Sequence, residues 1–112
     1  MKQTNALLHG TLEALILRSI ADEPRHGYAI ARWLEKATRN AIDIEDGSMY
    51  PALYRLDANG FIRAEWATSE LGRRVKRYRL TPKGRRRLAT ETKTWSRFAD
   101  AITAVLLGRG PA

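Results

Sequence analysis

The chain has 112 residues, a formal net charge of +8 and no cysteine, so it has room for one domain with a single modest core but for neither a disulfide framework nor a thiolate metal site. No apolar run reaches the roughly 18 residues of a membrane span, and the stretch from Met1 to Leu17 lacks the pattern of a signal peptide. These features exclude a cysteine-dependent or membrane-spanning protein and predict a cytoplasmic location.

Two amphipathic helices are predicted at the start of the chain. The first begins between Asn5 and Thr11, carries apolar residues at three- and four-residue spacing, and is closed by the turn at Pro24. The second opens at His26 and ends near Asn40, with an apolar stripe of the same spacing.

A short strand and a third helix are predicted next. The stretch from Ala41 to Ile44 alternates and contains β-branched residues, which is typical of a very short strand. The helix that follows has Asp46 or Ser48 as its cap and stops at Asn59-Gly60. Because Pro51 has no N–H group and suits only the first turn, we expect regular helix to begin close to Ser48.

A basic hairpin follows this helix. Two strands, Phe61 to Trp66 and Val75 to Leu80, are joined by the polar link from Ala67 to Gly72. The stretch from Gly72 to Arg87 holds nine Lys or Arg residues and no acid, whereas the other 96 residues are nearly neutral. Because nine bases repel one another, a polyanionic partner is favoured over a merely solvated charge run.

The last predicted element is a long helix. Thr81-Pro82 provides a Thr cap and a Pro at the first helical position, and the helix can run to about Leu107. Apolar residues near seven-residue spacing predict a dimerisation seam. The predicted seam consists of Leu88, Trp95, Phe98, Ala99, Ile102, Val105 and Leu106. Trp95 and Phe98 are also candidates for a pocket that takes a flat apolar ligand, and the pattern leaves both interpretations open.

This order of elements predicts an α+β, mainly α fold, a winged helix-turn-helix with a long C-terminal dimerisation helix. We expect residues 1–80 to form the DNA-binding domain and residues 81–112 to form the dimerisation helix and tail. The third helix is the element that can enter a major groove, and the hairpin would be the wing. The predicted DNA-contacting residues are Ser48, Tyr50, Tyr54, Arg55, Arg73, Arg74 and Lys76.

The chemistry of each side chain supports a contact with DNA, and an interpretation without DNA contact is also open. Arg55, on the outer face of the third helix, can read guanine or hold a phosphate, and the hydroxyl groups can bond to either. The wing cations can follow the backbone or enter the minor groove. The alternative is that the two tyrosines pack at the edge of the core and that Arg55 is a solvated charge. In the wing, Tyr78 is expected to turn inward.

The remaining polar residues predict no catalytic or metal site. His9 and His26 are the only histidines, and neither has an acid or a second histidine at metal-ligand spacing. We therefore expect no metal, no cofactor and no enzymatic activity.

Positive charge at Arg85 to Arg87 opposes the helix macrodipole, so either DNA phosphate or Glu91 should compensate this charge.

The chain resembles the PadR family of transcriptional regulators along nearly its whole length. The motifs that carry the resemblance are Leu7-Leu8-His9-Gly10-Thr11-Leu12, His26-Gly27-Tyr28-Ala29-Ile30, Gly47 to Leu56, Gly60-Phe61-Ile62, Trp66, Gly72-Arg73-Arg74, Tyr78 to Gly84 and Trp95. The resemblance implies a homodimer that binds a palindromic operator, usually as a repressor released by a small molecule. It further implies that Trp95 lines an aromatic pore at the dimer interface. The alternative function is a winged-helix module that binds another protein rather than DNA.

Overall fold

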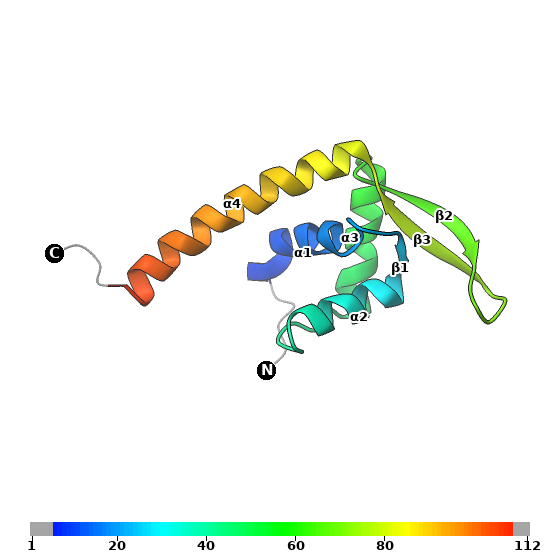
Figure 1. The fold of residues 1–112 in the computed structure, drawn as a ribbon, viewed down its shortest axis with the longest axis horizontal. Helices are drawn as coiled ribbons and strands as arrows, with labels where there is room; N and C mark the ends of the chain where they lie inside the picture. The colour runs from blue at the N-terminus through cyan, green and yellow to red at the C-terminus, as the bar shows by residue number, and fades with distance from the viewer. Residues whose placement is uncertain (1–5, 109–112) are drawn as a thin grey trace.

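The computed structural model describes the backbone of residues 6–108 and the side chains of residues 10–108. The elements are, in chain order, α1 (Ala6–Ser19), β1 (Arg25–His26), α2 (Gly27–Ala37), α3 (Asp46–Ala58), β2 (Ile62–Thr68), β3 (Arg74–Leu80) and α4 (Pro82–Leu106). The first three helices pack together, the β2–β3 hairpin projects to one side, and α4 extends away on the other (Figure 1). This arrangement confirms the predicted mainly α winged-helix fold. The tail at residues 109–112 and the side chains of residues 1–9, including His9, lie outside the described part.

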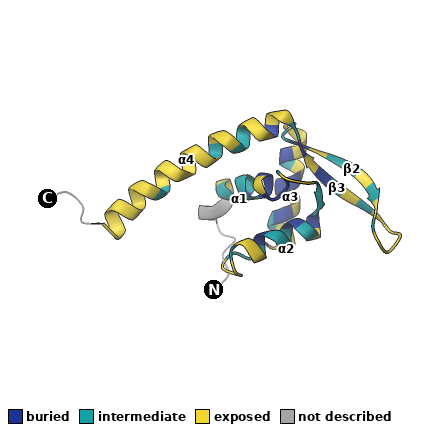
Figure 2. Cartoon of the chain, viewed as in Figure 1, coloured by how far each residue is buried: buried dark blue, intermediate teal, exposed yellow. Residues whose placement is uncertain are grey.

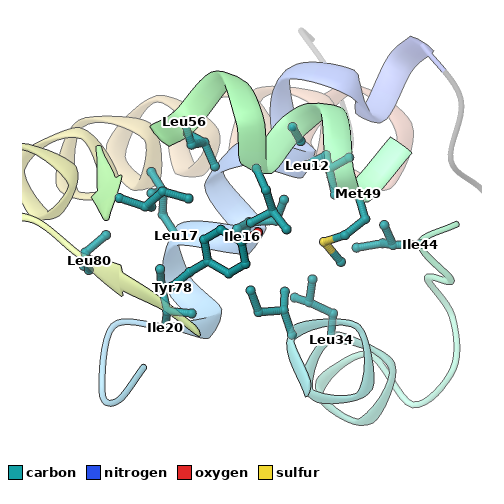
Figure 3. Packing of buried hydrophobic residues seen from close by; sticks show 14 residues of the cluster. Leu12, Ile16, Leu17, Ile20, Leu34, Ile44, Met49, Leu56, Tyr78 and Leu80 are labelled. Carbon is teal, nitrogen blue, oxygen red and sulfur yellow. The ribbon is translucent and has the colours of Figure 1, made fainter. Parts of the chain in front are cut away.

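One apolar cluster holds the winged body together. It joins Ile16 of α1, Leu34 of α2 and Leu56 of α3, and the ring of Tyr78 from β3 points into it (Figure 3). Ile16 has no exposed surface, because α1 is packed on several sides by the other elements. Burial of this kind contributes about 25 cal/mol per Å² of apolar surface, so the cluster fixes where α3 and the hairpin stand. The inward orientation predicted for Tyr78 is confirmed.

The sheet has the strand order β1-β3-β2, with both neighbouring pairs antiparallel. In the hairpin register Ile62 lies opposite Leu80 and Trp66 lies opposite Lys76. The connecting loop is closed by the N–H of Ser69, which donates to the carbonyl of Arg73 at 2.8 Å. Gly72 has a φ of +79°, a conformation that glycine adopts without a Cβ clash. The predicted hairpin is therefore confirmed, with strands longer than expected toward the loop.

The short strand is not where the sequence placed it. Residues 41–44 form no strand. The N–H of Ile42 bonds to the Thr38 hydroxyl at 3.2 Å instead of to a neighbouring strand, and Ile44 is buried in the core. The third strand of the sheet is instead β1, in which Arg25 pairs with Tyr78. A two-residue strand has no periodicity, so the sequence pattern gave no signal for it.

Helix α3 begins earlier than predicted. Its N-cap is Glu45, which makes no side-chain capping bond, and the amides of Ser48 and Met49 both donate to the Glu45 carbonyl at 2.9 Å. Pro51 thus lies inside the helix rather than in its first turn, and the expectation that helix starts near Ser48 is wrong. Pro51 is exposed, so water can donate a hydrogen bond to the helix carbonyl that lacks an amide partner because proline has no N–H.

Helix α4 is joined firmly to the base of the hairpin. The Thr81 hydroxyl accepts a bond from the N–H of Gly84 at 2.9 Å and donates to the Gly60 carbonyl at 2.7 Å. The predicted Thr81 cap is therefore confirmed. Beyond its first turns α4 is mostly exposed (Figure 2). Among the helices within residues 6–108, none combines the length and the apolar character needed to traverse a lipid bilayer.

Candidate nucleic-acid interface

Helix α3 has a buried face that anchors it and an exposed face beside it. Met49 and Leu53 are buried in the core, whereas Tyr50 and Tyr54 are 49% and 75% exposed. Ser48 is half-buried. Tyr50 and Tyr54 are four residues apart and share one exposed side of α3, whereas Ser48 comes two residues before Tyr50 and lies on a different side of the helix. The hydroxyl groups of all three are able to bond to phosphates or base edges.

Arg55 is placed differently from the expectation. Its Nε donates to Glu13 Oε2 of α1 at 2.9 Å, so the side chain is turned toward α1 and is only 39% exposed. Its Nη2 is buried and has no hydrogen-bond partner among the described residues. The prediction that Arg55 faces outward is wrong in this respect, because a carboxylate 42 residues away attracts it. Contact between Arg55 and DNA stays a prediction.

A shallow hollow of about 230 Å³ joins α2, α3 and the wing. Its lining residues are His26, Gly27, Tyr28, Tyr50, Val75, Lys76 and Tyr78. A Cβ on Gly27 would stand 3.1 Å from the ring and the hydroxyl of Tyr50, so the absence of a side chain at this position lets α3 approach α2. The hollow places Tyr50 of α3 and Lys76 of the wing at one site, although the sequence assigned them to separate elements.

Two residues that line this hollow, His26 and Tyr28, are not among the predicted DNA contacts. Tyr28 is 65% exposed, and the guanidinium of Arg32 lies 5.3 Å from its ring centroid. A side-chain hydrogen bond to Glu35 raises the pKa of Arg32, which keeps this group charged. His26 is a helix cap, because its Nδ1 accepts the N–H of Ala29 at 3.2 Å. The signal that could have found Tyr28 is the His26-Gly27-Tyr28 motif at the start of α2, where an exposed aromatic follows the cap.

The wing carries its predicted cations on the surface. Arg73, Arg74 and Lys76 are all exposed. The guanidinium of Arg74 lies 4.5 Å from the ring centroid of Trp66, and the ammonium of Lys76 lies 5.8 Å from it. Trp66 is itself 59% exposed. The outer part of the hairpin is thus a cationic surface organised around one aromatic ring.

Other cations of the basic stretch have partners within the chain. Arg79 pairs with Glu65 at 3.1 Å, and Lys83 donates to the Asn59 carbonyl at 2.8 Å. Arg87 pairs with Glu91 at 2.7 Å. Of the two ways to compensate the charge at the start of α4, Glu91 is therefore the one that Arg87 uses. The cations nearest the wing tip are the part of the stretch most available to a ligand.

A groove of about 500 Å³ lies between α1 and α4. Trp95 and Phe98 line it with ring centroids 5.9 Å apart, and Glu13 and Glu91 supply carboxylates to the same groove. The two aromatic rings are each about half exposed. The predicted ligand-binding pair is therefore brought together on one open surface, where Arg55 and Arg87 pair with the two carboxylates.

The predicted seam of α4 is exposed along most of its length. Its exposed members are Trp95, Phe98, Ile102, Val105 and Leu106, and Ala99 is half-buried beside them. Leu88 differs, because it packs against the core of its own chain. The apolar row that α4 leaves uncovered therefore begins one or two turns later than the sequence predicted.

The exposed hydroxyl groups of α3 and the exposed cations of the wing form a surface that can bind a polyanion. Within residues 10–108, no three His, Asp or Glu side chains gather closely enough to hold a metal ion. Tyr78, one of the residues that line the hollow, has a pKa raised above the ordinary value of tyrosine, first by burial and then by the charges of Tyr50 and Asp57. It is therefore a neutral group at physiological pH.

Comparison with known proteins agrees with this geometry. Residues 16–90 match the family described as Transcriptional regulator PadR-like family. The chain is 33% identical over 88 residues to the transcriptional regulator Rv3488 of Mycobacterium tuberculosis, a match that covers 78% of each chain.

Solved structures show the same arrangement of elements. A PadR-like transcriptional regulator from Bacillus cereus superposes with a TM-score of 0.80 and 29% identity, covering 96% of this chain and 100% of that one. A PadR family regulator from Eggerthella lenta gives a TM-score of 0.74 and 31% identity, covering 89% of this chain and 85% of that one.

Proposed function

The chain belongs to the PadR-like family of transcriptional regulators, and we propose that it acts as a cytoplasmic homodimer that represses transcription from a palindromic operator. This family comprises regulators rather than enzymes, and it has a DNA-binding winged-helix fold. The proposal assigns residues 1–80 to DNA binding and residues 81–112 to dimerisation. Its seven DNA contacts are Ser48, Tyr50, Tyr54, Arg55, Arg73, Arg74 and Lys76.

The observation that carries the proposal is the hollow shared by α3 and the wing. Tyr50 and Lys76 line it together, and Arg74 continues the cationic surface toward the wing tip. A duplex lying on α3 would therefore meet the wing cations at the same time. Contacts to phosphates would set the register, and contacts to base edges from α3 would set the sequence preference.

Dimerisation is supported by the apolar row of α4. Trp95, Phe98, Ile102, Val105 and Leu106 leave a contiguous apolar surface in contact with water, which in a small protein marks an interface. A two-fold dimer closed by this row would present two recognition helices about one duplex turn, roughly 34 Å, apart. That spacing is why a palindromic operator is expected.

Release by a small molecule is supported by the groove between α1 and α4. Trp95 and Phe98 offer an aromatic surface of suitable size for a planar effector, next to the helix that closes the dimer. A ligand would relieve repression only by binding more tightly to a dimer geometry in which the recognition helices are misplaced. A small aromatic effector is thus part of the proposal.

The test is a mobility-shift series with DNA taken from upstream of the chain's own gene and with a scrambled duplex of equal length. Wild-type protein should retain the upstream DNA at low salt as a complex of two protomers per duplex. Arg74→Gln with Lys76→Gln should weaken binding to both DNAs alike, because these residues are assigned to backbone contacts. The matched control is Lys93→Gln with Arg97→Gln, which removes the same charge from exposed positions of α4 and should change affinity far less.

The alternative function is a module that binds a protein partner. It predicts that wild-type protein retains neither duplex at any salt concentration. The upstream DNA also tests the repressor assignment, since a reporter driven by that DNA should be expressed more strongly when the gene is deleted. An unchanged or lower reporter signal would contradict repression while leaving DNA binding intact.

A further inference from the structure

The wing compensates its positive charge differently on its two faces. In the antiparallel register Trp66 is opposite Lys76 and Thr68 is opposite Arg74, so these four residues share one face. Glu65 is opposite Arg77 on the other face, where it also pairs with Arg79 at 3.1 Å. One face therefore has a carboxylate among its cations, and the other has an aromatic ring.

The face with the ring is the one that continues toward the recognition helix. Tyr78 and Leu80 follow Lys76 at two-residue spacing on β3 and enter the core, so this face is the inner side of the hairpin. Lys76 lines the hollow with Tyr50 of α3, whereas Glu65 lies on the opposite side. The carboxylate is thus kept away from the proposed DNA-binding surface.

We propose that Trp66 is a positioning residue of the wing, which holds Arg74 and Lys76 in place for the DNA backbone without adding a negative charge. The inference rests on the proposed DNA binding. Arg74 and Lys76 are like charges two residues apart on one strand face, and they repel each other. The negative face of an indole ring attracts both cations, and Trp is the strongest of the aromatic residues in this role.

A carboxylate at position 66 would attract the same two cations but would also repel phosphate. The ring leaves their charge intact, and it restricts two long side chains that would otherwise lose conformational freedom on binding. The geometry agrees with this role, because the Arg74 guanidinium is only 4.5 Å from the ring centroid while the ring keeps 59% of its surface exposed. Trp66 therefore has no role in the core that would explain its size.

The experiment is a mutant cycle on DNA affinity, measured by fluorescence anisotropy with a labelled duplex from upstream of the gene. Four proteins are compared: wild type, Trp66→Val, Arg74→Gln with Lys76→Gln, and the triple variant. Trp66→Val should raise Kd about three- to tenfold in the wild-type background, as expected when binding must order a long side chain that the ring no longer holds. It should have no effect in the background that lacks the two cations. Valine is chosen because it favours a strand.

Two results would overturn the inference. If Trp66→Val leaves Kd unchanged, the ring does not position the cations. If it weakens binding equally in both backgrounds, the ring contacts DNA directly or shapes the hairpin. A failure of wild-type protein to bind any duplex would instead refute the proposed function, so the two failures are distinguishable.

A graded series keeps the inference testable if Trp66→Val does not fold. Trp66→Phe keeps a ring that attracts cations more weakly, so its Kd should lie between those of wild type and Trp66→Leu. Equal Kd values for Phe and Leu at this position, with equal melting temperatures, would contradict a role for the ring. Trp66→Glu should fold and bind DNA more weakly than Trp66→Leu, because its carboxylate repels phosphate.

Discussion

Gly84 is the position where one added methyl group should displace the start of α4 from the winged body. A Cβ at this residue would overlap the carbonyl oxygen of Phe61 and stand 2.8 Å from Cδ1 of Leu80. The first obstacle is backbone, which cannot rotate away as a side chain can. Gly84→Ala therefore requires the first turn of α4 to move off the base of the hairpin.

The size of the effect follows from the contacts that this movement breaks. Overpacking a buried position costs about 1–3 kcal/mol. The Thr81 hydroxyl bonds to the Gly84 amide, so displacement of the turn also loses a cap, which costs about 1 kcal/mol. Each kcal/mol lowers the melting temperature of a domain of about 100 residues by roughly 4–8 °C. We expect Gly84→Ala to melt at least about 8 °C below wild type.

The assay is thermal unfolding followed by circular dichroism, at one protein concentration because the proposed dimerisation would make the melting temperature depend on concentration. The matched control is Gly47→Ala, also at a helical glycine, where an added Cβ meets no atom within 4 Å. Gly47→Ala should keep or slightly raise the melting temperature, since alanine favours helix over glycine. Equal melting temperatures for wild type and Gly84→Ala would refute the view that α4 packs tightly against Phe61 and Leu80 at this glycine.

Four further predictions concern Tyr78, Arg55, Glu13 and Ile102. Burial raises the pKa of Tyr78, so the folded state holds this proton more tightly than the unfolded state, whose tyrosine pKa is about 10. The stability that results from this difference is fully present below about pH 10 and is lost as the pH rises through the pKa of the folded state. The free energy of unfolding, measured with urea at pH 8 and at about pH 10.5, should fall less between these two pH values for Tyr78→Phe than for wild type. If Arg55 reads a base, Arg55→Ala should cost about 1–3 kcal/mol of operator binding and less on scrambled DNA, whereas equal losses in the mobility shift would assign it to the backbone. Glu13→Gln, which removes the charge that holds Arg55 toward α1, should lower the free energy of unfolding by no more than about 1 kcal/mol, because the pair is partly exposed to solvent. Ile102→Asp should convert the dimer to monomer in multi-angle light scattering without unfolding the winged body, and a dimer of unchanged mass would contradict the assignment of the α4 row.

The sequence predicted those elements whose signals are local. Thr81-Pro82 marks the start of α4 because a cap and a fixed φ act within one turn. Aromatic and β-branched content with flanking turn residues predicts the hairpin, and strand alternation places Tyr78 inward. The acid-free stretch from Gly72 to Arg87 located the charged surface without any knowledge of the fold.

What the sequence missed depends on contacts between distant residues. Arg55 turns toward α1 because of Glu13, and no local pattern records a pair separated by 42 positions. Leu88 fits a seven-residue repeat, but the winged body lies close enough to bury it. The strand pairing of Arg25 with Tyr78 likewise arises only when the sheet is assembled.

The central claim is that paired subunits hold a cationic wing and the outer face of α3 against a DNA duplex. Its most direct measurement is the affinity of wild-type protein for its upstream DNA between about 50 mM and about 200 mM salt, where log K should fall by about 0.9 per log unit of salt for each phosphate neutralised. Arg74→Gln with Lys76→Gln should reduce that slope by roughly 1.8, the value for two phosphates. A slope near zero in wild type, or the same slope in both proteins, would contradict the claim.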